Sequence, residues 1–273
     1  MNERIIEQMR KMEDVHGLIK VYHSYDNEKI RLWALEALAD IHDPEVVPTI
    51  AEALSEDEDE DVRSFAAHAL SLMKNAHAGP VLIDALLSDP SGQVRSKATY
   101  SLGRLKVQRA AKVLISALKD EHIAVRRNAA QALGMIGDLR AEKSLLEMIN
   151  TEPDQNVRAN IIKALGKLKS ILSIEHISKL LHAPQDKIVR AAIEALGWIG
   201  DKDCLEILKA FQDTEIKPLF RAELASIISK LEQQLLIEPA QSDNTDEFIP
   251  SMNKEKVDYK KILDRLNKIG TDG

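Results

Sequence analysis

Apolar residues recur along this chain with two periods, one of a helical turn and one of 31 or 32 residues. Within residues 125–136, apolar side chains stand at spacings of four, seven, eight and eleven, which places them along one side of an α-helix. Two apolar positions eight residues apart mark such a helix seven times. The pairs are Ile30 and Leu38, Val62 and Leu70, Val94 and Leu102, Val125 and Leu133, Val157 and Leu165, Ile188 and Leu196, and Leu219 and Ile227. The chain is therefore predicted to consist of about seven repeats.

A shorter apolar segment precedes each of these helices, and a polar turn joins the two. Examples of the first segment are 81–86, 113–118 and 144–149. Examples of the turn, acidic or containing proline, are 88–91, 151–154 and 183–186. Asp and Ser in such turns accept hydrogen bonds from the first free N–H groups of the following helix. Each repeat is predicted to be a pair of helices.

An arginine follows the first marker residue in five repeats and stands one position later in the last two. These residues are Arg31, Arg63, Arg95, Arg126 and Arg158, followed by Arg190 and Arg221. The position lies about 100° from the marker residue, at the flank of the buried stripe, and faces the neighbouring repeat. The predicted partners are acidic residues of the turns, Asp26, Asp61, Asp89, Asp120, Asp154, Asp186 and Asp213. Evenly spaced cations would also suit phosphate groups, but an ion-pair ladder between repeats is favoured.

The two ends of the chain differ from the repeats. Residues 1–12 carry apolar side chains at helical spacing and are predicted to form a helix that caps the first repeat. The repeats themselves are expected to fill residues 13–237. Residues 238–252 are polar and acidic with two prolines, as in a flexible linker, and 253–273 are expected to form an amphipathic tail helix. The tail helix is predicted either to dock on its own repeats or to bind a partner.

Composition narrows the class of protein. Among 273 residues, 44% are apolar and only 4% aromatic, which favours helix over sheet. The net charge of -7 argues against attraction of the whole surface to nucleic acid or to an anionic membrane. Cys204 is the only cysteine, so no disulfide framework is expected, and no apolar leader or membrane-length segment is found. These features favour a cytoplasmic protein.

Two segments resemble a known repeat class. Residues 124–138 and 188–201 read AVRRNAAQALGMIGD and IVRAAIEALGWIGD, and they are similar to the short HEAT repeats named after phycobilisome lyases. The resemblance covers roughly residues 13–236 and implies an all-α fold, a right-handed α-solenoid of about seven two-helix HEAT-like repeats with a capping helix and a tail helix. The class includes chromophore-lyase subunits, a hydroxylase, relatives of DNA glycosylases and scaffolds, so it indicates a fold rather than one function.

Catalytic and metal-binding patterns are sparse. The hydroxylases of this class bind iron through His-Glu pairs, and no His-Glu dipeptide occurs here. The eight histidines show no i, i+4 pair on one helix, and no phosphate loop or nucleophile motif is present. Cys204 falls in an amphipathic first helix, where packing is expected rather than nucleophilic chemistry. No cofactor or metal is predicted, and a non-catalytic role is favoured.

In the HEAT resemblance the second helices line a concave groove, and positions two, three, six and ten after the marker residue point into it. The predicted partner-binding residues are Trp33, Lys97, Tyr100, Arg104, Arg127, Gln131, Lys163, Lys167, Arg190 and Trp198. The first two repeats also bring Glu36, Asp40, Phe65 and His68 to these positions. Repeats three to six carry six basic residues against one acidic residue, interleaved with two aromatic rings. That pattern suits an acidic peptide or protein surface, and a plain solvated face is the alternative.

Three functions remain open from the sequence. The favoured one is a protein-protein interaction scaffold or adaptor that binds another protein through an acidic or mixed surface. A nucleic-acid binder or DNA glycosylase-like protein is the first alternative, based on the basic centre of the groove and its aromatic residues. A bilin lyase-like, chromophore-handling subunit is the second, with Glu36 and Asp40 as groove acids.

Overall fold

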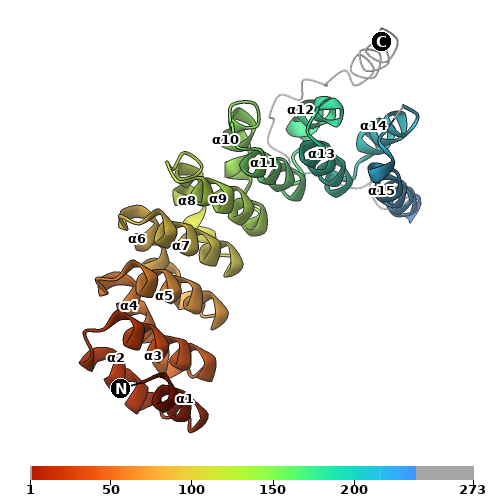
Figure 1. Ribbon diagram of the computed structural model, residues 1–273. Helices are drawn as coiled ribbons and strands as arrows, with labels where there is room; N and C mark the ends of the chain where they lie inside the picture. The colour runs from red at the N-terminus through yellow and green to blue at the C-terminus, as the bar shows by residue number, and fades with distance from the viewer. Residues whose placement is uncertain (1, 215, 238–273) are drawn as a thin grey trace, which may run out of the picture. The chain divides into compact units, whose positions relative to one another are not determined.

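The computed structural model describes residues 2–214 and 216–237, and within those ranges the secondary structure is α-helix and short 3-10 turns without any β-strand (Figure 1). The α-helices are α1 (Glu3–Lys11), α2 (Val15–Ser24), α3 (Glu28–Ile41), α4 (Val47–Glu56), α5 (Glu60–Leu72), α6 (Gly79–Ser88), α7 (Gly92–Arg104), α8 (Ala111–Ala117), α9 (Ile123–Ile136), α10 (Glu142–Met148), α11 (Gln155–Lys167), α12 (Ile174–Lys179), α13 (Asp186–Ile199), α14 (Lys202–Gln212) and α15 (Pro218–Ile237). The all-α prediction is confirmed.

Helices α2 to α15 alternate as first and second helices of the repeats. Direct packing joins α2 to α3, α4 to α5, α6 to α7, α8 to α9, α12 to α13 and α14 to α15. The predicted markers of the second helices fall in α3, α5, α7, α9, α11, α13 and α15. The two-helix repeat was therefore correctly read from the sequence.

The chain divides into two compact units, with unit 1 ending at Ala164 and unit 2 beginning at Leu165. In unit 1 the second helices pack in the order α3, α5, α7, α9, and the first helices in the order α4, α6, α8 (Figure 1). In unit 2, α13 packs against α12, α14 and α15.

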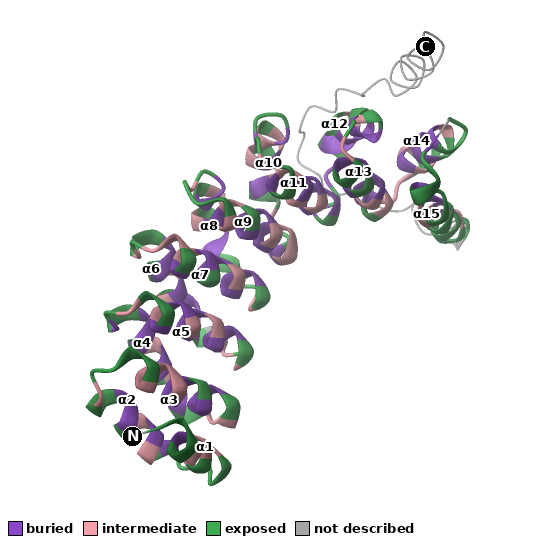
Figure 2. Cartoon of the chain, in the orientation of Figure 1, coloured by how far each residue is buried: buried purple, intermediate pink, exposed green. Residues whose placement is uncertain are grey.

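Most of the marker residues lie in the core of their unit, with the exceptions of Ile30, Leu219 and Ile227. Val94 and Leu102 are fully buried on α7, as are Val125 and Leu133 on α9, so one side of each second helix is buried in Figure 2. Small residues let these helices approach closely. A methyl group added to Gly103 would lie 2.7 Å from Cβ and 2.8 Å from Cα of Ala132. The contact between α7 and α9 thus requires glycine at this position.

Helix α1 covers the start of the repeats. Asn2 caps it by accepting a hydrogen bond from the N–H of Ile5, and Ile6 is buried where α1 packs on α2 and α3. The predicted linker at 238–252 and tail helix at 253–273 lie outside the described residues.

An ion-pair ladder connects successive repeats of unit 1, as predicted. The arginine of one second helix pairs with the acidic residue that follows the first helix of the next repeat. The four pairs are Arg31 with Asp57 at 2.8 Å, Arg63 with Asp89 at 2.8 Å, Arg95 with Asp120 at 2.9 Å, and Arg126 with Glu152 at 3.0 Å. The arginine side chains are only 12–15% exposed and the acidic ones 2–13%. These arginines are therefore structural.

Each of these ion pairs, which we call a rung of the ladder, also fixes the turns between helices. Nη1 of Arg63 donates to the carbonyl oxygens of Asp57 and Glu58, both at 2.9 Å, while the Asp57 carboxylate accepts from Arg31. The same carboxylate accepts the N–H of Asp59 at 3.0 Å. One turn is thus held by arginines of two successive repeats, and its buried polar groups are satisfied.

The acidic partners were only partly predicted. Asp89 and Asp120 are confirmed, whereas Asp57 and Glu152 pair in place of Asp61 and Asp154. Asp154 instead caps α11 by accepting the N–H of Val157. In these two turns the residue two positions after the ladder acid, Asp59 or Asp154, caps the next helix.

The other predicted acidic partners have different roles. Asp26 contributes only its main-chain carbonyl oxygen to Arg31, Asp186 pairs with Lys217, and Asp213 is the C-cap of α14. Arg158 also departs from the prediction, because its Nε donates to the Ile149 carbonyl oxygen at 2.7 Å. Position 184, which is 26 residues after Arg158, holds proline instead of an acid.

The turns cap the second helices at some of the predicted positions. Ser91 accepts the N–H of Gln93 and Asp154 that of Val157, as expected. The prediction was wrong at Asp186, which is the first residue of α13 and follows Gln185, a cap residue whose side chain makes no capping hydrogen bond.

Candidate functional site

Basic residues that neighbour the ladder arginines on the same helices are more exposed than those arginines. On α7, Arg95 is bound in a rung, while Lys97 and Arg104 are exposed. On α9, Arg126 is bound in a rung, while its neighbour Arg127 is exposed. Lys97, Arg104 and Arg127 form no ion pair with any residue in the described ranges. These cations are available to a ligand.

Four side chains of α5 and α7 lie close together, namely His68, Lys97, Tyr100 and Arg104. Nη1 of Arg104 donates to the Tyr100 hydroxyl at 3.3 Å, and the guanidinium carbon lies 5.9 Å from the centre of the Tyr100 ring. The His68 and Tyr100 ring centres are 5.9 Å apart. Burial, followed by the charges of Lys97 and Arg104, lowers the pKa of His68. The imidazole is therefore neutral near pH 7, and its buried Nδ1 has no hydrogen-bond partner.

We call Lys97, Tyr100, Arg104, Arg127 and Gln131 the basic stripe. All five lie on α7 and α9, which pack directly together. Tyr100 and Gln131 are half-buried and the three cations are exposed. The structure thus brings these five predicted residues to adjoining helices of unit 1. Charge–charge attraction and a half-buried aromatic ring are the chemistry this surface offers.

Helix α3, the second helix of the first repeat, carries acidic side chains at the corresponding positions. Trp33, Glu36 and Asp40 on α3 line a cleft of about 440 Å³ against α1. Burial, then the charges of Asp40 and Glu3, raises the pKa of Glu36. Arg10 pairs with Asp40 at 3.3 Å across the cleft. This acidic cleft with an indole wall is distinct from the basic stripe.

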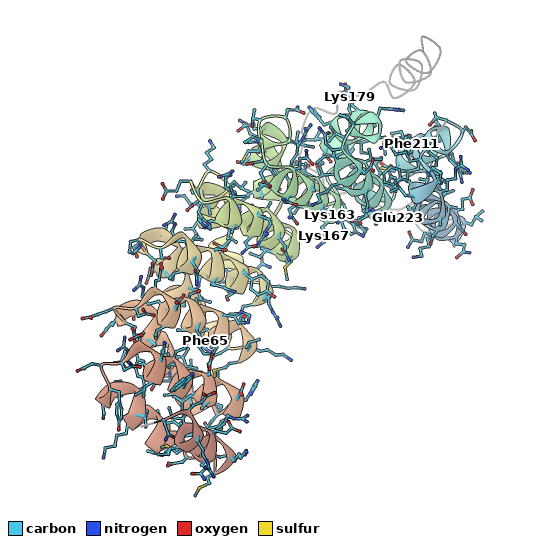
Figure 3. All side chains as sticks on the ribbon, viewed as in Figure 1. Phe65, Lys163, Lys167, Lys179, Phe211 and Glu223 are labelled. Atoms are coloured by element: carbon cyan, nitrogen blue, oxygen red, sulfur yellow. The ribbon has the colours of Figure 1, made fainter. Side chains whose placement is uncertain are left out.

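The remaining predicted residues differ in their surroundings. Lys163 is half-buried, and Lys167 on the last turn of α11 is exposed (Figure 3). The Lys167 Nζ lies 5.5 Å from the centre of the Trp198 ring, which is 39% exposed. Arg190 faces Glu223 of α15 at 3.6 Å. Within unit 2, Lys167 therefore lies over the Trp198 ring, and Arg190 pairs with Glu223.

Sequence reasoning missed part of the surface around Trp198. Ile227, Lys230, Leu231 and Gln234 of α15 line a cleft beside this indole. The position rule selects other residues of α15, because it counts from Leu219, which is 46% exposed. The available signal was a second apolar stripe at helical spacing, Phe220, Leu224, Ile228 and Leu231, which the structure buries.

The candidates for reactive chemistry are Cys204 and the side chains of the metal-ligating residue types. Burial, then the hydrogen bond and charge of Asp201, raises the pKa of the Cys204 thiol, which is fully buried in α14. Cys204 is therefore a packing residue, as predicted. Across residues 2–214 and 216–237, His, Cys, Asp and Glu side chains form no group of three suited to a metal ion. None of the described helices is long and apolar enough to cross a membrane.

Comparison with known sequences identifies the repeats. The HEAT-repeat profile matches residues 15–103, 79–165 and 142–229, which together span most of the chain. The chain belongs to the HEAT-repeat family. A phycocyanobilin lyase subunit alpha from Picosynechococcus sp. is 32% identical over 115 residues, covering 38% of this HEAT-repeat protein. The match spans 42% of that relative, less than half of its length.

Solved structures share the fold. The complex of CpcE and CpcF of phycocyanin lyase from Nostoc sp. matches with a TM-score of 0.54 and 22% identity, covering 80% of this chain and 94% of that one. An engineered protein matches with a TM-score of 0.58 and 20% identity, covering 86% and 71%. The predicted resemblance to HEAT repeats of the phycobilisome-lyase class is confirmed. At these identities the structures show the fold alone.

Proposed function

We propose that this HEAT-repeat protein is a non-catalytic interaction scaffold whose basic stripe binds an acidic peptide or protein surface. One observation carries the proposal. Arg95 and Arg126 are held in the ladder, yet Lys97, Arg104 and Arg127 beside them stay exposed without an ion pair among the described residues. Exposed cations that stabilise no fold contact are typical of a recognition surface.

The charge distribution supports an acidic partner. The chain carries a net charge of -7, so three exposed cations and a half-buried tyrosine on two adjoining helices are a local exception. Such a patch steers an acidic partner and suppresses association with basic ones. Tyr100, held by Arg104, adds apolar area at low entropic cost, as tyrosines do in binding hot spots. Lys163, Lys167, Arg190, Trp198 and Trp33 are proposed as further partner-binding residues, each within its own unit.

The comparisons support a partner in general terms. One structural neighbour is a complex of two protein chains, CpcE and CpcF, and repeat proteins offer extended surfaces for other proteins. A cytoplasmic site of action is part of the proposal, supported by the single cysteine of the sequence.

The test is affinity capture from the source organism, with half of each sample treated with nuclease. The variant carries glutamate at four positions, Lys97, Arg104, Lys163 and Lys167. A matched control carries glutamate at four exposed lysines of first helices and their turns, Lys112, Lys119, Lys143 and Lys202. Circular dichroism checks that both variants remain helical.

The proposal predicts a captured protein whose recovery is unaffected by nuclease. The control variant should still capture it, and the variant with glutamate at Lys97, Arg104, Lys163 and Lys167 should not. Recovery of nucleic acid alone would instead favour the nucleic-acid or glycosylase-like function. Equal capture by the two variants would refute the basic stripe as the binding surface.

A second candidate is bilin handling. Its support is the lyase subunit relative together with the acidic cleft of Trp33, Glu36 and Asp40. Carboxylates beside an indole suit a conjugated ligand with protonated ring nitrogens. Mixing the protein with phycocyanobilin should shift the absorbance spectrum, and Glu36→Gln should reduce the shift. An unchanged spectrum would exclude this candidate.

A further inference from the structure

Unit 2 contains a small cleft between its last two second helices. It measures about 210 Å³ and is lined by Gly197 and Trp198 of α13 and by Ile227 and Leu231 of α15. Its walls are mostly apolar, and Trp198 remains 39% exposed although it is the largest apolar side chain of the helix. A tryptophan left open beside an apolar hollow is typical of an anchor site in protein recognition.

Gly197 keeps the cleft open at its base. A methyl group at this position would lie 2.7 Å from Cγ2 of Ile227, so any larger residue would displace a wall of the cleft. Helices α13 and α15 pack directly together, which gives the hollow a fixed floor made by the buried Leu231.

The size of the cleft limits what can occupy it. Sites for small molecules and cofactors usually have volumes of about 300–1,000 Å³, and this cleft is smaller. One large apolar side chain is the occupant that fits such a space. The anchor residues of protein partners commonly bind in this way, surrounded by a polar rim.

The rim of the cleft sets the charge of the partner. Lys230 is exposed at the rim, and the Lys167 Nζ lies 5.5 Å from the Trp198 ring centre. Neither lysine forms an ion pair with a described residue. Glu194 also lines the cleft and is already partnered. The two lysines therefore favour carboxylates next to the bound side chain.

We infer that this cleft, which we call the Trp198 cleft, seats a phenylalanine-like side chain of a partner segment that carries acidic residues on either side of it. The inference rests on the proposed function, because it supplies the apolar anchor for an acidic partner. It adds a defined position and a defined residue class to that function.

The probe is a fluorescein-labelled peptide, Ser-Asp-Glu-Phe-Glu-Asp-Ser, titrated into the full chain with anisotropy as the readout. Three comparison peptides replace the phenylalanine by alanine, all acids by their amides, or all acids by lysine. The protein variants are Trp198→Ala and, as a matched control, Leu172→Ala, which truncates another exposed large apolar side chain of unit 2 that does not line the cleft.

We expect saturable binding that weakens about tenfold or more with Trp198→Ala and with the alanine peptide. Leu172→Ala should bind like the wild type. The amide peptide should bind more weakly, and the lysine peptide should not bind. Lys167→Gln with Lys230→Gln should remove most of the preference for acids, whereas Lys112→Gln with Lys119→Gln should retain it.

A second readout covers the case in which Trp198→Ala fails to fold. In the Trp33→Phe chain, Trp198 is the only tryptophan, and its emission should shift to the blue when the peptide covers it. No binding by the wild type, equal binding of the alanine peptide, or an unchanged emission maximum on binding would each overturn the inference. Capture that still depends on Lys97 and Arg104 would then show that the proposed function survives without the Trp198 cleft.

Discussion

The two units are built from the same repeat but stabilised in different ways. In unit 1, four arginines at one repeat position are buried in ion pairs of 2.8–3.0 Å with acids of the next repeat. In unit 2, the arginine stands one position later, and Arg190 faces Glu223 at 3.6 Å with 48% of its side chain exposed. Buried apolar residues such as Cys204, Leu208 and Phe220 remain to hold this unit.

The repeated arginine therefore stabilises the contact between repeats in unit 1 but lies on the surface in unit 2. A shift of one residue rotates a side chain by about 100° around a helix. Arg190 consequently belongs to the exposed surface of its helix, whereas Arg95 and Arg126 belong to the contact between repeats.

The largest expected loss of unfolding free energy follows from breaking one buried ion pair of the ladder. Arg63→Ala leaves the Asp89 carboxylate buried without its cation, which costs about 3–5 kcal/mol of unfolding free energy. Arg190→Ala should cost below about 1 kcal/mol, because its pair is largely exposed. Urea unfolding followed by circular dichroism measures both. Equal losses would show that the ladder is not what distinguishes unit 1.

The next effect concerns helix contacts. Gly103→Ala places a methyl group against the main chain of Ala132, so we expect a loss of about 1–3 kcal/mol. Gly197→Ala meets only the side-chain methyl of Ile227, which can move, and should cost less. Unfolding of the two variants in parallel checks the order, and a more damaging Gly197→Ala would contradict it.

Acid should weaken unit 1 through its ladder carboxylates. Burial alone would raise the pKa of Asp57 and of Asp120, but the hydrogen bonds and charges of Arg31 and Arg95 hold both pKa values below the ordinary 3.8. Such groups contribute stability above 3.8 and lose it as the pH falls further. Unfolding free energy should therefore drop as the pH is lowered through and below 3.8. Asp57→Asn should flatten that drop, and an identical pH profile would count against the mechanism.

The smallest effect is at the helix ends. Gly137 and Gly200 end their helices with φ values of 80° and 77°, while Lys106 adopts 48° after α7. A non-glycine residue in this left-handed region costs roughly 1 kcal/mol, so Lys106→Gly should raise the midpoint of thermal unfolding slightly. Lys112→Gly, inside α8, is the control and should lower it.

Much of the fold could be predicted because the repeat is recorded in apolar spacing. The marker residues placed every second helix, and their register is one residue off in α15, where Phe220 and Ile228 are buried in place of Leu219 and Ile227. The exact acids could not be chosen by composition, because residues 57–61 are all acidic. Position was the missing signal: each ladder acid in the second to fifth repeats stands six residues before the next arginine, as Asp57 does before Arg63.

The candidate site was predictable only where the marker residues give the true register of a helix. Lys97, Tyr100 and Arg104 were selected by their positions on α7 and lie together. The Trp198 cleft was missed because half of it comes from α15, where the marker Ile227 is half-buried and lines the cleft instead of the core. Burial of Lys163 also depends on packing that spacing does not reveal.

The central claim is that exposed cations beside the ladder bind the partner, while the ladder arginines hold the fold. Calorimetric titration of the captured partner into wild type, Lys97→Glu with Arg104→Glu, and Lys112→Glu with Lys119→Glu tests it most directly. The account predicts at least a tenfold weaker affinity for the first variant, on the order of 1.4 kcal/mol or more, with unchanged unfolding, and wild-type affinity for the second. Equal affinities for the two variants would contradict it.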